Sequence, residues 1–133
     1  MEPTVGIYIT EKDYERLSLL IQHSDTRAAS QLEEELARAK VVPQDQIPKN
    51  IVTMNSKVRF KDEVSDKESE VTLVYPQDAD VTKSQVSILA PVGLALIGLK
   101  EGQSIEWPMP NGVRKLKVVE IIYQPEAAQN WDQ

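Results

Sequence analysis

The chain has 133 residues, 41% of them hydrophobic and 27% charged, which provides for one compact domain or for a smaller one with an appendage. Its 15 basic and 21 acidic residues give a net charge of −6, which argues against direct, sequence-independent binding to nucleic acid. The absence of cysteine excludes disulfides, thiolate catalysis and cysteine-based zinc sites. The sequence starts without the pattern of a signal peptide, so we expect a cytoplasmic protein with no membrane partner.

Residues 1–42 have the pattern of two short helices. Thr10, followed three residues later by Asp13, is typical of a helix start, because the hydroxyl can accept from an early backbone amide. Because each helix has one narrow apolar stripe, we expect the stripes to be buried only against each other, in an antiparallel helical hairpin or short coiled coil. The stripes are Tyr14, Leu17 and Ile21 and, after a polar break at 22–27, Ala29, Leu32, Leu36 and Ala39.

The polar break is the predicted tip of the hairpin, and its candidate residues are His23, Asp25 and Arg27. Metal-assisted hydrolysis ordinarily needs more than one carboxylate, and the break has only Asp25, with a cation two residues away. His23 is the single histidine and is expected on the surface. The run 33–35 of three Glu predicts a solvated helix face with two of the three outward. We therefore expect no catalytic residue, no metal site and no cofactor.

Two prolines, Pro43 and Pro48, restrict the backbone of residues 43–50, which we interpret as an extended linker and domain boundary. The second domain then covers residues 51–133. Basic and apolar residues alternate over 57–61, which predicts a strand with one basic and one apolar face. Residues 61–69 are predicted to be a polar connection. Further strands are expected at 71–75, 105–107 and 113–123, with a hairpin turn at 111–112.

The most informative segment is 86–107. Alternating apolar residues from Val86 predict a buried strand, and Pro91 favours the start of a helix, which we expect over 92–99. Gly98 and Gly102 favour turns with positive φ. The prediction is an α+β chain: the helical hairpin, then an antiparallel sheet of about five strands around one short helix.

This succession of elements resembles the C-terminal domain of the bacterial transcript-cleavage factors GreA and GreB. Further blocks, at 52–60, 72–76, 90–99 and 123–128, are similar to the short, Gre-like Rnk branch of that family. The resemblance implies a C-terminal domain similar to FK506-binding prolyl isomerases (FKBP-like). The residues that carry the Gre resemblance are Ser87, Pro91, Ala95, Leu96, Ile97, Gly98, Glu101, Gly102, Pro110 and Gly112.

The resemblance also implies a partner, RNA polymerase. Gre factors insert a coiled coil into the secondary channel of the polymerase, where paired acids at the tip help to hold magnesium for RNA cleavage; these acids have no counterpart beside Asp25. We therefore expect a non-cleaving regulator that binds at the channel entrance and competes with Gre-type cleavage factors. The polymerase-contacting positions of the family map onto Ser87 and Pro91, and Leu89 stands where the family has an acid.

Several alternatives stay open. Ser87 and Pro91 are equally consistent with a strand-surface hydroxyl and a helix starter. The chain could instead be an interaction module that binds another regulatory protein without contacting polymerase, and its oligomeric state is open. Prolyl isomerisation is disfavoured, because such a pocket is rich in aromatic residues. The second domain has only Phe60, Tyr75, Trp107, Tyr123 and Trp131.

Overall fold

A computed structural model of the chain describes residues 7–24, 26–109 and 112–128. The N-terminal part contains β1 (Tyr8–Thr10), α1 (Glu11–Gln22), α2 (Arg27–Arg38) and β2 (Lys40–Val42). Over these described ranges, no helix has both the length and the apolar character needed to cross a membrane. The remaining elements are the 3₁₀ turns η1 (Gln44–Gln46), η2 (Pro76–Asp78) and η3 (Val81–Lys83), the helix α3 (Pro91–Leu96), and the strands β3 (Lys57–Asp62), β4 (Lys67–Val74), β5 (Gln85–Ser87), β6 (Ser104–Met109) and β7 (Gly112–Tyr123).

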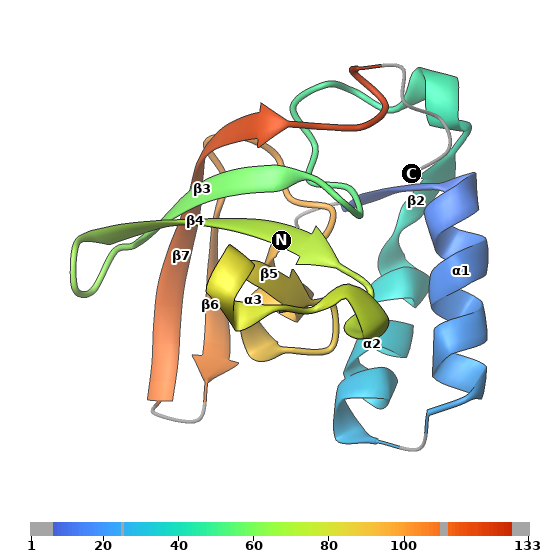
Figure 1. Cartoon of the computed structure of the whole chain (residues 1–133), viewed down its shortest axis with the longest axis horizontal. Coiled ribbons are helices and arrows are strands. Elements are labelled where there is room, and N and C mark those ends of the chain that lie inside the picture. Colours follow the sequence, from blue (N-terminus) through green and yellow to red (C-terminus); the bar gives the residue numbers. More distant parts are fainter. Residues whose placement is uncertain (1–6, 25, 110–111, 129–133) are drawn as a thin grey trace.

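The main sheet has five strands in the order β5-β4-β3-β7-β6, with α3 packed near β5 and β6 (Figure 1). All its pairings are antiparallel except β4 with β5, which is parallel. The predicted α+β class and the antiparallel sheet of about five strands around one short helix are confirmed, with β5 as the one parallel strand among the described pairings of this sheet. The FKBP-like similarity stays a prediction.

The two N-terminal helices form as the sequence predicts. The Thr10 side chain caps α1, its Oγ1 accepting from the Asp13 N–H at 3.0 Å, and Thr26 caps α2 by accepting from the Ala29 N–H at 3.1 Å. Figure 1 shows the helices side by side and running in opposite directions at one end of the sheet. The short parallel pair of β1 and β2, which joins the open ends of the hairpin, was not predicted.

The apolar stripes of the helices belong to the main core. Leu17 and Leu32 are fully buried, and they share one hydrophobic cluster with Leu94 and Leu96 of α3 and with Val58 of β3. The expectation that the stripes would be buried only against each other is therefore wrong. The hairpin shares its buried side with the sheet domain, so the core continues across the predicted boundary at 43–50. That boundary itself stays a prediction.

The alternation predicted for residues 57–61 is confirmed, because Val58 and Phe60 are buried in β3 while the basic residues between them face outward. Each outward cation has an acidic neighbour. Arg59 lies 3.0 Å from Glu120 on β7 and 3.5 Å from Glu70 on β4, and Lys61 lies 2.7 Å from Asp66. The basic face of the strand is thus neutralised within the fold.

Two boundaries differ from the sequence prediction. The polar connection expected over 61–69 is confined to 63–66, because residues 67–70 extend β4 as a solvent-exposed end paired with β3. The short helix begins at Pro91 and ends at Leu96, earlier than expected, and Gly98 follows it with the predicted positive φ of 78°. The exposed end of β4 contributes no core side chain, so apolar alternation could not locate it.

Helix α3 approaches β5 so closely that only glycine fits at Gly93. A Cβ at this position would lie 2.3 Å from the carbonyl oxygen of Ser87 and 3.0 Å from the Cα of Ile88. Both are backbone atoms, so they cannot move aside by a change of rotamer. The turn between β5 and α3 is therefore held in place by this contact.

We predict that Gly93→Ala lowers the free energy of unfolding by about 3 kcal/mol, because the strand and helix must separate. Gly102→Ala is the matched control. Nothing lies within 4 Å of a Cβ there, although its φ is +86°, so only the backbone strain remains and the loss should be about 1 kcal/mol. Chemical denaturation of both variants measures the difference, and equal losses would contradict the close approach.

Candidate functional site

The most distinctive polar feature is a buried carboxylate, Asp13, between α1 and the turn formed by residues 53–56. Asp13 is only 3% exposed. Its Oδ2 accepts a hydrogen bond from the Met54 backbone N–H at 3.1 Å, and the Tyr75 hydroxyl donates a longer one to Oδ1 at 3.5 Å. Asp13 thus joins the first helix to the sheet domain.

A second buried carboxylate holds the same turn from the other side. Glu126 accepts from the Thr53 hydroxyl at 2.7 Å, and the Thr53 and Ser56 hydroxyls lie 2.9 Å apart. Next to it, the buried Gln124 amide donates to the carbonyl oxygens of Pro48 at 2.9 Å and Ile51 at 2.7 Å. The segment after β7 therefore fixes both the 53–56 turn and the end of the predicted linker.

Burial determines the electrostatics of this network. Loss of water around Asp13 raises its pKa from 3.8 to about 6; the Met54 N–H opposes this rise and the negative charge of Glu126 adds to it. Burial also raises the pKa of Tyr75, so its hydroxyl stays protonated and donates to Asp13. Asp13 and Tyr75 therefore have a structural role: they hold α1 against the 53–56 turn and the end of β4.

The predicted docking residues lie together where β5 meets α3. Ser87 ends β5, and its Oγ accepts from the Leu89 N–H at 3.0 Å, so the hydroxyl shapes the turn. Leu89 is half-buried and packs against the core, whereas Pro91 is exposed at the first position of α3. A docking role for these three residues stays a prediction, with Pro91 the most accessible of them.

The hairpin tip is partly described. His23 is the exposed C-terminal cap of α1, and Arg27 is exposed at the start of α2, whereas Asp25 lies outside the described residues. Of the run 33–35, two Glu are exposed and only Glu35 is buried, paired with Arg38, which confirms the expected solvated face. The described ranges contain no group of three His, Asp or Glu side chains placed to hold a metal ion.

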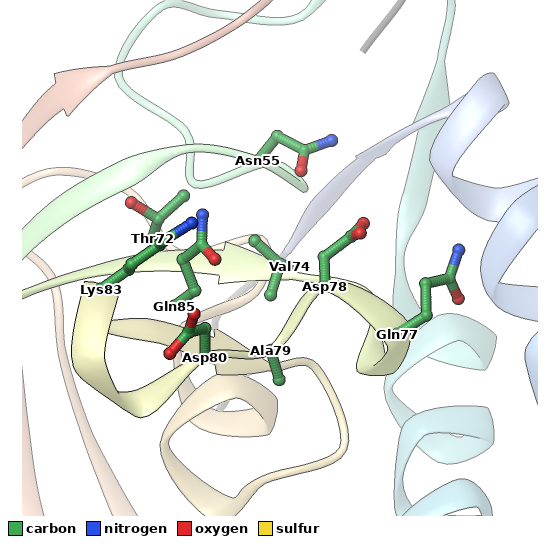
Figure 2. A pocket seen from close by; sticks show the side chains of 9 residues that line it. All are labelled: Asn55, Thr72, Val74, Gln77, Asp78, Ala79, Asp80, Lys83 and Gln85. Atoms are coloured by element: carbon green, nitrogen blue, oxygen red, sulfur yellow. The ribbon is translucent and has the colours of Figure 1, made fainter.

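A groove missed by the sequence analysis runs from α1 to β5. It consists of two adjoining cavities, of about 670 Å³ beside α1 and about 420 Å³ beside β5. Both are lined by Asn55, Gln77 and Asp78 (Figure 2). We call them together the α1–β5 groove. No sequence signal could have located it, because its lining comes from three separate segments of the chain, at 16–23, 55 and 72–85.

The fold and its N-terminal hairpin match known sequence families. The sequence model of the transcription elongation factor GreA/GreB C-terminal domain matches residues 47–123, and that of the Rnk N-terminus matches residues 6–42. The chain belongs to the GreA/GreB family. Within it, the N-terminal match places the chain with the Rnk proteins, as the sequence blocks predicted.

Individual relatives agree with this assignment. The regulator of nucleoside diphosphate kinase of Escherichia coli K12 is 42% identical over 130 residues, covering 94% of this chain and 95% of the relative. The transcription elongation factor GreA of Clostridium botulinum Eklund 17B is 42% identical over 91 residues, which are 68% of this chain and 57% of GreA. A solved GreA/GreB structure from Nitrosomonas europaea has 48% identity and a TM-score of 0.75, covering 90% of this chain and all of that one. Membership of this family supports a role like that of transcription elongation factors.

The raised pKa of Asp13 predicts a specific pH dependence of stability. Between pH 3.8 and about 6 the folded protein holds a proton that the unfolded chain has released, so stability falls as pH rises through this window. Near neutral pH, Asp13→Asn should therefore raise the free energy of unfolding by up to about 3 kcal/mol, since the amide still accepts from Met54 without a buried charge.

Denaturation of the wild type and of Asp13→Asn at several pH values tests this expectation. The difference should shrink toward zero in acid, where Asp13 is protonated in both folded and unfolded chains. Glu15→Gln, on the exposed side of the same helix, is the control and should change stability little at any pH. A destabilising effect of Asp13→Asn near neutral pH would contradict the dominance of burial.

Proposed function

We propose that this protein is a non-cleaving transcription regulator that binds RNA polymerase at the entrance of the secondary channel and competes there with Gre-type cleavage factors. The observation that carries the proposal is the combination of a Gre-type C-terminal domain, matched over residues 47–123, with a short hairpin packed on that domain. The domain supplies the docking surface, and the hairpin occupies space beside it.

The length and position of the hairpin favour a protein that blocks the binding of a cleavage factor over one that cleaves RNA itself. Helices α1 and α2 have 12 residues each, and at 1.5 Å per residue each is about 18 Å long. Both are packed against the core of the sheet domain through Leu17 and Leu32. A hairpin held in this way has little length with which to reach beyond the surface where the domain docks.

The composition of the tip supports the same proposal. Residues 22–27 contain one carboxylate, Asp25, between His23 and Arg27. A divalent cation that activates water is ordinarily held by several anionic oxygens, and a neighbouring guanidinium opposes its binding. The tip is therefore poorly suited to complete a magnesium site for RNA cleavage.

The junction of β5 and α3 is the proposed point of contact with polymerase. It is held rigidly by the Ser87–Leu89 hydrogen bond and by the close approach at Gly93, so its exposed edge is preorganised. The paired charges on β3 leave no uncompensated basic stripe on that strand, which favours contact with protein over nucleic acid.

Binding and cleavage assays test the proposal directly. The purified protein should bind core RNA polymerase, should displace a Gre cleavage factor from it, and should produce no RNA cleavage on stalled elongation complexes. Cleavage that depends on Asp25 would overturn the non-cleaving assignment. Failure to bind core polymerase would favour the alternative of a module that binds another regulatory protein.

A single substitution tests the docking junction. Pro91→Glu should weaken polymerase binding about tenfold or more, because it places a charge at the exposed edge of the junction. The fold should tolerate it, since an acidic residue at the first helical position interacts favourably with the helix dipole. Lys100→Glu, exposed just beyond the other end of α3, is the matched control and should bind as the wild type does. Equal binding by both variants would remove this junction from the interface.

A further inference from the structure

The α1–β5 groove is lined by polar side chains that belong neither to the core nor to the docking junction. Its centre is formed by Asn55, Gln77 and Asp78, and its β5 end adds Thr72 and Gln85 (Figure 2). Within the described residues, the side chains of Asn55, Gln77 and Gln85 make no hydrogen bond to another part of the chain. A side-chain amide offers both donors and an acceptor, so three of them along one groove can pair with successive N–H and C=O groups of an extended backbone.

The end of the groove beside α1 is mainly apolar. Its apolar lining is Leu19, Leu20 and Tyr75, with Arg16 and His23 beside them, and Leu19 is 55% exposed although it is a large hydrophobic residue. The cavity there measures about 670 Å³, which is enough for one large apolar side chain of a partner. Leu19 also lines a neighbouring depression on the outer side of α1, so its side chain separates the two depressions.

The groove has charges of both signs: Arg16 lines its α1 end, and Asp80 and Lys83 line its β5 end. Asp78 lies at the junction of the two cavities, and its carboxylate forms no ion pair within the part of the chain that the structure describes. By contrast, the Asp80 carboxylate accepts hydrogen bonds from Thr82. An unpaired carboxylate next to an apolar hollow is complementary to a basic side chain placed close to an apolar one.

From these features we propose that the α1–β5 groove binds an extended polypeptide segment of RNA polymerase. The segment places one large apolar side chain against Leu19 and Tyr75, sets a neighbouring basic side chain against Asp78, and pairs its backbone with the amides of Asn55, Gln77 and Gln85. This inference rests on the proposed function and adds a second contact, distinct from the β5–α3 junction.

Two groove variants with matched controls test the inference. Leu19→Asp introduces a charge into the apolar end, and Asp78→Lys reverses the charge at the centre. Both residues are exposed, so the fold should tolerate the changes. The controls are Val64→Asp, which is 66% exposed on the β3–β4 turn at the opposite side of the molecule, and Glu106→Lys, exposed on β6 (Figure 1). Thermal denaturation confirms that all four variants are folded.

Binding to core RNA polymerase is then measured for the wild type and all variants. Leu19→Asp and Asp78→Lys should each weaken binding about tenfold or more, while both controls bind as the wild type does. Short overlapping peptides from the polymerase subunits provide a second readout. Peptides that bind the wild type should carry an apolar residue close to a basic one and should lose affinity for Asp78→Lys.

The outcomes separate the two proposals. If the wild type binds polymerase and both groove variants bind equally well, the groove inference is overturned and the proposed function stands. If the groove variants weaken binding while Pro91→Glu does not, the groove is the principal contact. If the wild type does not bind polymerase, the proposed function fails and the inference fails with it.

Discussion

The position of the helical hairpin depends on the burial of Asp13 against the 53–56 turn. The Met54 N–H has its hydrogen-bond partner in Asp13, and on the other side the Thr53 hydroxyl has its partner in Glu126. Two buried carboxylates within one network cost stability, and the cost is offset only while every donor of the turn is paired. Helix α1, the turn and the segment after β7 are therefore fixed together, and the apolar side of the hairpin is buried in the common core.

The fold was largely predictable because two sequence signals agree on where the elements lie: the apolar periodicity, and the Thr, Pro and Gly residues that mark helix starts and turns. Thr10 caps the first helix, Pro91 starts the third, and Gly98 and Gly102 have positive φ, each for the reason that the residue type suggests. The pairing partners of several strands were not predictable, even where a strand places a side chain in the core, as β1 does with Ile9. The exposed end of β4, the parallel pairing of β5 and the β1–β2 pair depend on backbone hydrogen bonds, which leave no mark on hydrophobic spacing.

The candidate site was predictable only where it is continuous in sequence. The junction around Ser87 and Pro91 could be found because its residues are neighbours and resemble a family pattern. Asp13 was interpreted as a helix-start residue, which is correct but incomplete, because its partners Tyr75 and Glu126 lie far along the chain. The α1–β5 groove exists only after folding, since its lining converges from separate segments. Periodicity identifies which face of an element is buried but not which distant side chain meets it.

A hairpin fixed to its domain gives the proposed regulator a different physical basis from a projecting coiled coil. In the proposed function, binding energy comes from preorganised surfaces, the β5–α3 junction and the α1–β5 groove, and none is spent on ordering the hairpin. The network around Asp13 holds α1 in place, and α1 forms one wall of the groove through Leu19 and Leu20. The same buried carboxylate that positions the hairpin therefore also shapes a proposed contact with polymerase, so that docking and occlusion depend on one structural element.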